Sequence, residues 1–544
     1  LTIHRKFRNP NTKQLDAIFD QVSKMRNSGN YYNLKVGADY YVSSKTTVGF
    51  VTSGFMNPSK FNSNTTSFLK NSSNEIDSVV TAVSNQTEDW KNGSVNVNFR
   101  HQFDSTGREI TADVDYVTYD ASSDQTFKST SFGTNGQKRS EDAFRGSLPV
   151  KIDIYTAKMD YAQPMKGDMK LEAGVKAGYV KTDNAAKYFT VRGTSEAPDY
   201  GKTNTFQYTE NISAAYINLN KQWKKLGVQA GLRYEHTSYT GDQFGNPQRP
   251  DSTFKNSYGS LFPTIFTTYK LHKNHQLGAS FGRRIDRPQY QDLNPFLEFI
   301  DVYTYNQGNP YMRPQLTNNF EVSHTFKSFL TTTVNYSHTK DLRAETFEQG
   351  ANLNGSNDYA TIVKRGNIGV RDAAGIAVSA QIPVRKWWSA MVYTNYNYTK
   401  YSGAINNGEN IDVAASNLMF NVNNQFKFNK GWSAELSGFY RTKGVEGQIL
   451  IQPMGQMNIG VGKQVMKGKG SVKFSVRDLL YTNFPQGSIN FSNTEAKFTN
   501  RRDSRVANLA FTYRFGKPMK DQKPRRKIGG ADDELNRVNA GNGN

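Results

Sequence analysis

Apolar and polar side chains alternate one by one along most of the chain. In residues 93–103 (GSVNVNFRHQF) every second residue is mainly apolar or aromatic, and the residues between them are amides or carry charge. Residues 109–119 repeat this alternation after a short turn at 104–107, whose glycine permits the positive φ that tight turns need. A period of two residues is that of a β-strand, so the segment predicts a β-hairpin with one apolar face.

The same hairpin pattern recurs, and its connections alternate between short and long. Turns of about two to five residues, such as 224–225 and 429–431, alternate with loops of about fifteen to thirty-five residues, such as 57–92 and 120–146. An apolar sheet face can meet either a soluble core or lipid. Short turns at one end and long loops at the other are typical of an outer-membrane barrel, with the short turns in the periplasm and the long loops outside the cell.

Counting the hairpins gives the size of the barrel. About nine short-turn hairpins and a last strand at 507–515 make roughly nineteen strands, whereas single-chain bacterial barrels have an even number. The odd count predicts that early strands lie outside this sequence. The expected fold class is all-β, a transmembrane antiparallel β-barrel of the 22-stranded type with about nineteen of its strands present.

The pattern divides the chain into three regions. Residues 1–29 are expected to be the stump of an early strand and an outer loop, with a short helical turn around 15–25. Residues 30–515 are expected to form the outer-membrane β-barrel domain. Residues 516–544 have no period and end in glycine and asparagine, so they predict a flexible periplasmic C-terminal tail in which the acidic run 532–534 is solvated.

Composition agrees with a barrel and limits the other classes. No window of about 18 apolar residues occurs, so no transmembrane helix is expected. The 544 residues carry a net charge of +21 and no cysteine, which excludes disulfides and cysteine metal sites. The lysines and arginines are spread over turns, inward positions and the tail. They therefore suit outer-membrane lipid and lipopolysaccharide phosphates, or an anionic solute, better than nucleic acid.

Tryptophans gather at one predicted end of the strands. Four of the five lie beside short turns, which predicts an aromatic girdle at a membrane interface, although tryptophan also favours strand ends in general. These membrane-interface aromatics are Trp223, Trp387, Trp388 and Trp432.

One long loop between predicted strands, about 287–314, carries four prolines and many aromatic residues. Proline removes backbone donors, so this loop cannot be a continuous strand. Its aromatic side chains could contact a ligand, or they could pack the loop onto the barrel rim. The candidate ligand-contacting residues are Tyr290, Phe296, Phe299, Tyr303, Tyr305 and Tyr311.

Several charged residues occupy the polar face of the predicted strands. They could line the solute path, or they could pair with one another across neighbouring strands. The candidate lumen-facing residues are Arg100, Asp113, Asp115, Glu435, Lys473 and Arg514.

Sequence signatures of catalysis are missing. No phosphate-binding loop, nucleophile elbow or zinc-protease motif occurs, and the seven histidines show no close metal-ligand spacing. The sequence therefore predicts neither an enzyme nor a metal or cofactor site.

Four motifs occur in a fixed order: GLRYE at 231–235, FGRRIDRPQYQDLNPF at 281–296, NQGNPYMRPQLTNNFE at 306–321 and SVRDLLYTN at 475–483. Together with the aromatic last strand they resemble the barrel of TonB-dependent receptors, most closely that of the Bacteroidetes outer-membrane β-barrel proteins. The third motif departs from the family pattern GNP…L…PE at Met312 and Gln315.

The resemblance implies energy-coupled uptake of a scarce or bulky solute, such as a siderophore-like compound, a peptide or a glycan, across the bacterial outer membrane. Full-length relatives couple to TonB through an N-terminal plug. No plug can be placed in these residues, so coupling is expected through a plug that is not in this chain. The alternative is a barrel without transport function that acts in assembly, adhesion or secretion.

Overall fold

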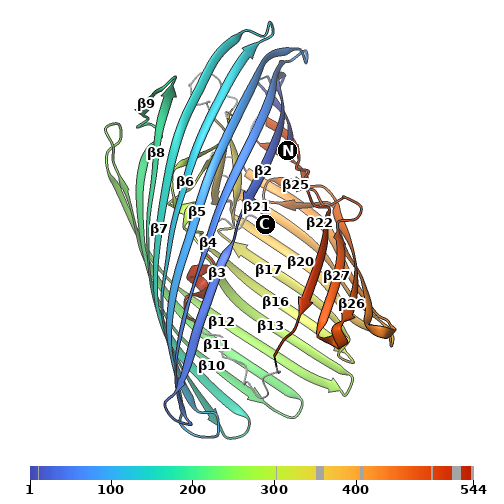
Figure 1. Ribbon diagram of the computed structural model, residues 1–544. Coiled ribbons are helices and arrows are strands. Elements are labelled where there is room, and N and C mark those ends of the chain that lie inside the picture. The colour runs from blue at the N-terminus through green and yellow to red at the C-terminus, as the bar shows by residue number, and fades with distance from the viewer. Residues whose placement is uncertain are drawn as a thin grey trace.

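The computed structural model consists almost entirely of strands. They form one sheet of 26 strands, which curves into a barrel, and a second sheet of four strands (Figure 1). Among the described residues, no helix has the length and apolar content needed to cross a membrane. The structure describes residues 1–9, 12–301, 303–350, 360–404, 410–491, 494–516 and 529–540.

The elements of the fold have the following bounds. The strands of the large sheet are β1 Thr2–Arg8, β2 Leu15–Gly29, β3 Tyr32–Tyr41, β4 Thr46–Asn71, β5 Ile76–Gln102, β6 Glu109–Gly133, β7 Lys138–Met165, β8 Met169–Arg192, β9 Ser195–Pro198, β10 Asn204–Gln222, β11 Leu226–Phe244, β12 Ser252–His272, β13 His275–Asp286, β16 Gln315–Phe326, β17 Leu330–Lys340, β20 Val370–Arg385, β21 Trp388–Ala404, β22 Asn410–Lys427, β23 Trp432–Arg441, β24 Gly444–Glu446, β25 Ile449–Ile451, β26 Met454–Val465, β27 Gly470–Arg477, β28 Gln486–Phe491, β29 Thr494–Thr499 and β30 Val506–Tyr513. The small sheet holds β14 Leu297–Asp301, β15 Thr304–Gln307, β18 Arg343–Gly350 and β19 Ala360–Asn367, and the helices are η1 Gln291–Leu293, η2 Asn429–Gly431, η3 Met466–Gly468 and α1 Asp532–Leu535.

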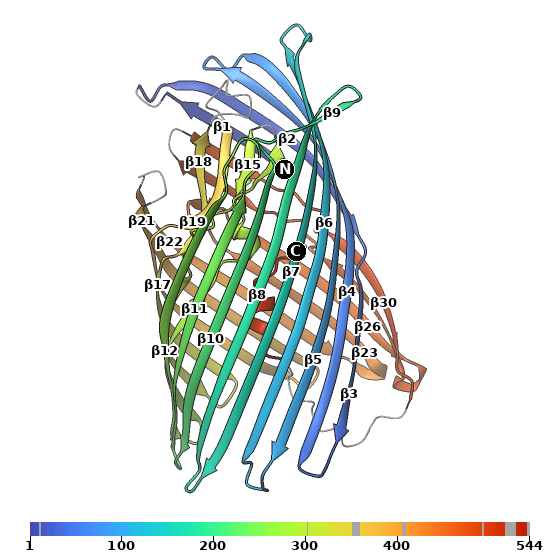
Figure 2. The same cartoon turned by 90° about the vertical axis from the view of Figure 1, so that its left-hand side faces the viewer.

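Neighbouring wall strands pair antiparallel, mostly in sequence order, as the hairpin pattern predicts (Figure 2). Some wall strands are broken into two segments. β2 and β3, for example, follow one another along the single strand β4. Such breaks explain why the sheet has more strand segments than the sequence predicts. The end of the barrel where β5 joins β6 is called the turn end, and the opposite end is called the loop end.

The wall has its polar face inside and its apolar face outside. On β6, Asp113 is 1% exposed whereas the next residue, Val114, is 57% exposed. The same inversion recurs on other strands, where outward residues such as Val97 and Val175 are exposed and inward residues such as Lys176 are buried. This is the reverse of a soluble sandwich and matches a barrel whose outer surface meets lipid.

Two sequence predictions about loops were wrong. The expected loops at 57–92 and 120–146 are mostly strand, because β4 to β7 extend until only 72–75 and 134–137 connect them. The expected helical turn at 15–25 is part of β2. Serine, threonine and asparagine fill these extensions, so no apolar period marks them in the sequence. The backbone ladder nevertheless supplies its hydrogen bonds whatever the side chains are.

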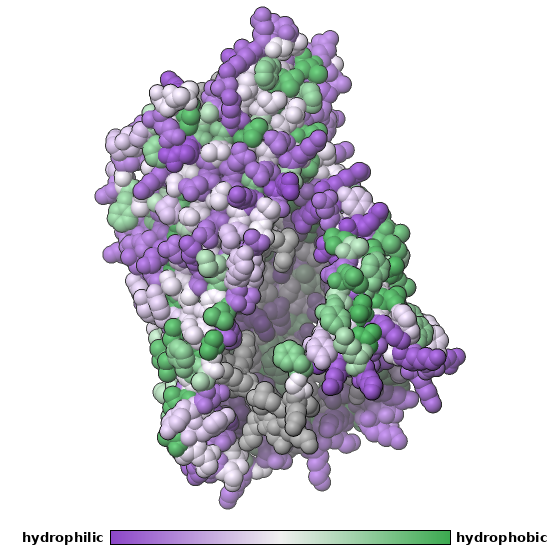
Figure 3. All heavy atoms as spheres, viewed as in Figure 1, coloured by the Kyte–Doolittle hydropathy of each residue, from purple (hydrophilic) through white to green (hydrophobic). Residues whose placement is uncertain are grey.

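The sheet has two bare edges at the turn end. β3 pairs only with β4, and β30 only with β27, in the part of the chain that the structure describes. Both faces of these strands are open to solvent, as Leu34 (71% exposed) and Leu509 (72% exposed) illustrate. Figure 3 shows an opening into the interior on this side of the molecule. Toward the loop end the two sides are joined, since β1 pairs with β2 and with β29.

The small sheet lies across the interior at the loop end (Figure 2). It combines the segments that follow β13 and β17, and β15 pairs in parallel with β19. The Tyr303 ring packs against Phe19 of β2, with ring centroids 4.8 Å apart, and Arg5 of β1 donates a hydrogen bond to Thr304 (2.9 Å). The loops therefore reach from one side of the barrel to the other.

The C-terminal segment, residues 529–540, also lies inside the barrel, and this differs from the expected free tail. Glu534 of α1 is 1% exposed, so the prediction of a solvated acidic run was wrong for this residue. The reason is pairing, because Lys176 on the inner wall holds its carboxylate at 3.0 Å.

The direction of the side chains can be tested with adjacent residues on β5. Val97 faces outward, and Asn98 faces inward beside Asp113 of β6. Val97→Arg should destabilise the folded barrel by about 2–4 kcal/mol, because it places a charge in lipid near mid-depth. Asn98→Arg, at the same depth, should cost little. Denaturant unfolding in lipid vesicles measures both, and equal losses would contradict the assignment of the two faces.

Candidate functional site

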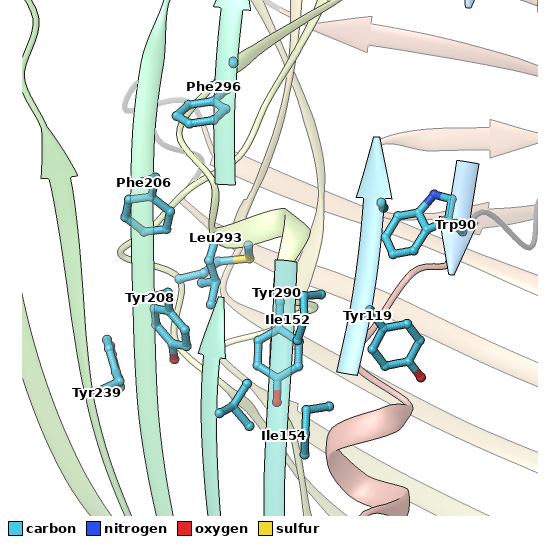
Figure 4. Close-up of a cluster of buried hydrophobic side chains, with 14 of the residues drawn as sticks. Trp90, Tyr119, Ile152, Ile154, Phe206, Tyr208, Tyr239, Tyr290, Leu293 and Phe296 are labelled. Carbon is cyan, nitrogen blue, oxygen red and sulfur yellow. The ribbon is translucent and has the colours of Figure 1, made fainter. Parts of the chain in front are cut away.

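The aromatic residues of the loop 287–314 are mostly packed away. Tyr290, Phe296, Tyr303 and Tyr305 are buried, and Tyr311 is 71% exposed. The side chain of Phe299 lies outside the described residues. Figure 4 shows Tyr290, Leu293 and Phe296 gathered with Ile152, Ile154, Phe206 and Tyr208 of the wall. This packing attaches the loop to the wall, and the ligand-contacting role of these aromatics stays a prediction.

Next to this aromatic cluster lies a cavity with a volume of about 1240 Å³. Strands β8 and β10 to β13, the folded-in loops and the C-terminal segment contribute to its lining. Ten cationic and seven acidic side chains line it, so the cavity carries excess positive charge. Because low-dielectric walls focus such a field, the cavity attracts anions.

Most of these arginines already hold a carboxylate. Arg287 pairs with Glu235 at 2.6 Å, Arg343 with Asp286 at 2.8 Å, and Arg365 with Asp292 at 3.1 Å. These ion pairs fix the orientation of the guanidinium groups. They do not use every N–H donor, since the Nε atoms of Arg287 and Arg343 are buried without a hydrogen-bond partner.

Three further arginines, Arg283 and Arg284 of β13 and Arg371 of β20, line the cavity and form no ion pair with a described carboxylate. The Nε atom of Arg371 is also buried without a hydrogen-bond partner. Burial raises the pKa of Asp292, against the lowering effect of its ion pair with Arg365. Arg284 is exposed, and Arg371 also donates a hydrogen bond to Thr339 at 3.4 Å. Guanidinium groups without a carboxylate partner are suited to bind carboxylate or phosphate oxygens.

The candidate lumen-facing residues lie elsewhere on the wall. Asp113 and Asp115 are buried beside the C-terminal segment, and Arg514 follows β30 and is exposed. The other three form cross-strand pairs: Arg100 with Glu109 at 2.6 Å, and Lys473 with Glu435 at 3.0 Å. None of the six lines the cavity. Their place on a solute path stays a prediction.

Sequence reasoning missed the cavity itself. Arg284 belongs to the motif FGRRIDRPQ, which was noticed only for its family resemblance. Two adjacent arginines at the end of a strand were a signal. Arg371, about ninety residues later, had none, because the register of β13, β16, β17 and β20 is what places it in the same row across the wall as Arg284.

The four girdle residues lie at the turns where the sequence places them. Trp223, Trp387 and Trp432 are about half exposed, and Trp388 is partly buried. Lys221 and Lys463 set their ammonium groups 5.6 and 4.7 Å from the ring centroids of Trp223 and Trp432. Their contact with the membrane interface stays a prediction.

No cluster that could hold a metal ion, of three or more histidine, aspartate and glutamate residues, occurs in the described ranges.

Comparison with known proteins decides the family. The sequence model of the family described as "Outer membrane protein beta-barrel family" matches residues 101–513, well over half of the chain. The chain belongs to this outer-membrane β-barrel family. It is therefore a protein of the bacterial outer membrane, as the alternation and the turns predict. No curated protein matches the chain.

Solved structures with a similar fold include receptors and transporters. The copper transporter OprC matches with a TM-score of 0.55 and 13% identity over 89% of this chain and 80% of its own. The ferric yersiniabactin uptake receptor FyuA from Yersinia pestis matches with a TM-score of 0.52 and 11% identity over 94% and 79%. The ferric-catecholate import receptor Fiu from K12 E. coli gives 0.52 and 11% over 94% and 82%. At these identities the likeness concerns the fold, and it confirms the resemblance to TonB-dependent receptor barrels at that level.

Lipid contact of the girdle can be measured by fluorescence quenching. Brominated lipids that carry bromine near the headgroup should quench Trp223, Trp387 and Trp432, because half-exposed indoles at the ends of outward faces reach the interface. The fifth tryptophan, Trp90, is buried in the aromatic cluster and serves as the control. A variant with the other four replaced by Phe should lose most of the quenching, and strong quenching of Trp90 alone would contradict this arrangement.

Proposed function

We propose that this chain is the barrel of an outer-membrane receptor that takes up a scarce or bulky solute and that this solute carries negative charge. The observation that carries the proposal is the arginine-lined cavity, with Arg284 and Arg371 free of carboxylate partners in the described structure. Family membership and the shared fold of import receptors support uptake, and the cavity supports the charge of the solute. No enzyme activity is part of the proposal.

The paired arginines support an anionic solute as much as the unpaired ones do. A guanidinium presents five donors in a rigid fork, and a single carboxylate uses only part of them. Arg287 and Arg343 are therefore held in place by Glu235 and Asp286 while keeping a buried Nε donor. A ligand with several carboxylate, phosphate or phenolate oxygens would satisfy these donors together. Siderophore-like compounds, acidic peptides and acidic glycans all carry such groups.

Completing the receptor requires more strands. Unpaired backbone groups are costly in hydrocarbon, so β3 and β30 need partners within the membrane. We propose that two further strands fill the opening between them and give a barrel of the 22-stranded type, with residues 1–29 as an early strand segment, 30–515 as the barrel and 516–544 as its C-terminal extension. Coupling to TonB would be through a plug supplied by another segment or chain. Lipid and lipopolysaccharide would surround the outer face.

A second candidate function is a barrel without transport that acts in assembly, adhesion or secretion. The observation that favours it is the obstructed interior, because the small sheet reaches across to β1 and β2. Receptors also block their barrels, so obstruction alone does not decide between the two functions. Energy-dependent accumulation of a solute does.

Binding of an anionic probe tests the proposal. The trisulfonated dye pyranine should bind the purified protein saturably, as followed by fluorescence anisotropy. Arg284→Gln and Arg371→Gln should each weaken this binding about tenfold, because each removes charge-assisted hydrogen bonds worth roughly 1.5 kcal/mol. Lys473→Gln is the matched control, since Lys473 is a lumen cation that does not line the cavity.

Transport is tested with the same probe in cells that produce the protein from its complete gene. We expect accumulation of pyranine that stops when an uncoupler removes the proton-motive force. Binding without energy-dependent accumulation would support the second function. Absence of binding, or equal loss in Lys473→Gln, would contradict the assignment of the cavity to an anion.

A further inference from the structure

Two buried charged side chains of the inner wall, Lys176 and Glu210, form no ion pair with another described wall residue, although Glu210 accepts a hydrogen bond from the hydroxyl of Tyr208 at 3.0 Å. Lys176 of β8 and Glu210 of β10 are 6% and 2% exposed. In the pairing of the two strands Lys176 lies opposite Ala214, so the two charges are four residues apart along the wall. Their ion-pair partners among the described residues all come from the C-terminal segment, residues 529–540.

The first half of this segment binds through carboxylates and backbone. Lys176 lies 2.9 Å from Asp533 and 3.0 Å from Glu534. Gly530 donates its backbone N–H to Asp115 of β6 at 2.7 Å. Gly178 makes room for Glu534, because a Cβ atom at this glycine would lie 3.1 Å from the carboxylate.

The second half binds through Arg537, which is buried. Its guanidinium pairs with Glu210, donates to the carbonyl of Pro288 at 2.8 Å and lies 4.2 Å from the ring centroid of Tyr290. Burial alone would lower the pKa of Arg537, but Glu210 and the neighbouring tyrosines hold it well above its usual value. The guanidinium of Arg537 is thus held by Glu210 of the wall and by Pro288 and Tyr290 of the loop.

Backbone contacts extend the same recognition. The N–H of Tyr290 donates to the carbonyl of Arg537 at 3.1 Å. The side-chain amide of Gln291 contacts both backbone groups of Asn539, accepting from its N–H at 3.2 Å and donating to its carbonyl at 3.3 Å. Leu535 and Val538 pack against the aromatic cluster. Paired amide contacts of this kind recognise a peptide backbone whatever its side chains are.

We propose that this wall is a peptide-binding site and that residues 529–540 are its resident ligand. The site fits a short peptide with a carboxylate and an arginine one helical turn apart, as Glu534 and Arg537 are. The proposal does not depend on the proposed uptake of an anion. The two sites meet, because Asp533 and Arg537 also line the cavity, so the bound segment places its own carboxylates beside the arginines there.

A disulfide trap tests whether the position of residues 529–540 on the inner wall depends on the ion pairs of Lys176 and Arg537. The chain has no cysteine of its own. A Cβ atom at Gly530 would lie 3.2 Å from the Cβ atom of Lys158, within reach of a disulfide, so the Lys158→Cys/Gly530→Cys variant of the full chain should cross-link on mild oxidation. Lys473→Cys/Gly530→Cys is the matched control and should not.

Charge exchange at Arg537 gives the decisive comparison. In the trap variant, Arg537→Glu should lower the yield of cross-link at least tenfold, and adding Glu210→Arg should restore it. Arg537→Gln, a milder change, should give an intermediate yield. Heat-modifiable mobility on gels confirms that each variant is folded. An unchanged yield in Arg537→Glu would overturn the proposal, because the segment would then lie there without its ion pair.

Binding in trans tests the ligand class. The full chain carrying Arg537→Glu should bind a labelled peptide GGADDELNRVNA, because its own segment no longer competes. The same peptide with glutamate in place of arginine should bind at least tenfold more weakly. Equal binding of the two peptides, or none, would contradict a peptide site that reads an arginine. The peptide result depends on Arg537 and the pyranine result on Arg284 and Arg371, so this proposal and the proposed function can fail separately.

Discussion

The structure depends on one constraint, which is that a backbone facing lipid has no water to satisfy its N–H and C=O groups. A strand in such surroundings must pair on both edges, and the antiparallel order from β4 to β27 meets this requirement strand by strand. Pairing in turn fixes the side chains, because alternate residues must point to opposite faces. Val114 therefore lies outside and Asp113 inside, although they are neighbours in the sequence.

The same constraint concentrates charge in the interior. Ionisable residues that cannot face lipid gather inside the barrel, where the dielectric is low and an unpaired charge is expensive. Loops and terminal segments whose charges are opposite to those of the inner wall are then bound inside the barrel. Arg365 of β19 pairs with Asp292 of η1 in the loop 287–314, and Arg537 of the C-terminal segment pairs with Glu210 of the wall. The interior is therefore occupied by the chain's own segments as a consequence of how its wall is built.

Local periodicity is the part of the structure that the sequence predicts. Hairpins with apolar alternation, such as β5 with β6, are visible because lipid demands an apolar residue at every second position. The polar extensions of β4 to β7 were missed, since serine, threonine and asparagine fill most of their positions, and the few apolar residues that pack inside, such as Val80, Ala82 and Phe127, are too sparse to mark a period. The cavity was missed for another reason. Arg284 and Arg371 are far apart in sequence, and the register of the strands from β13 to β20 aligns them across the wall. Pairing of 529–540 with β8 and β10 likewise spans more than three hundred residues.

The unpaired strand edges and the occupied interior both follow from the cost of leaving polar groups without partners away from water. Each of β3 and β30 pairs with a described strand on one edge only, so backbone groups on the other edge have no strand partner and both strand faces are open. Where the wall carries Lys176 and Glu210, the charges are met by a segment from the far end of the chain. A strand edge can be satisfied only by another strand, whereas a charged wall can exchange one partner for another of like charge. The edges of β3 and β30 thus require a further strand as a fixed structural partner. At the inner wall, by contrast, another ligand can compete with residues 529–540.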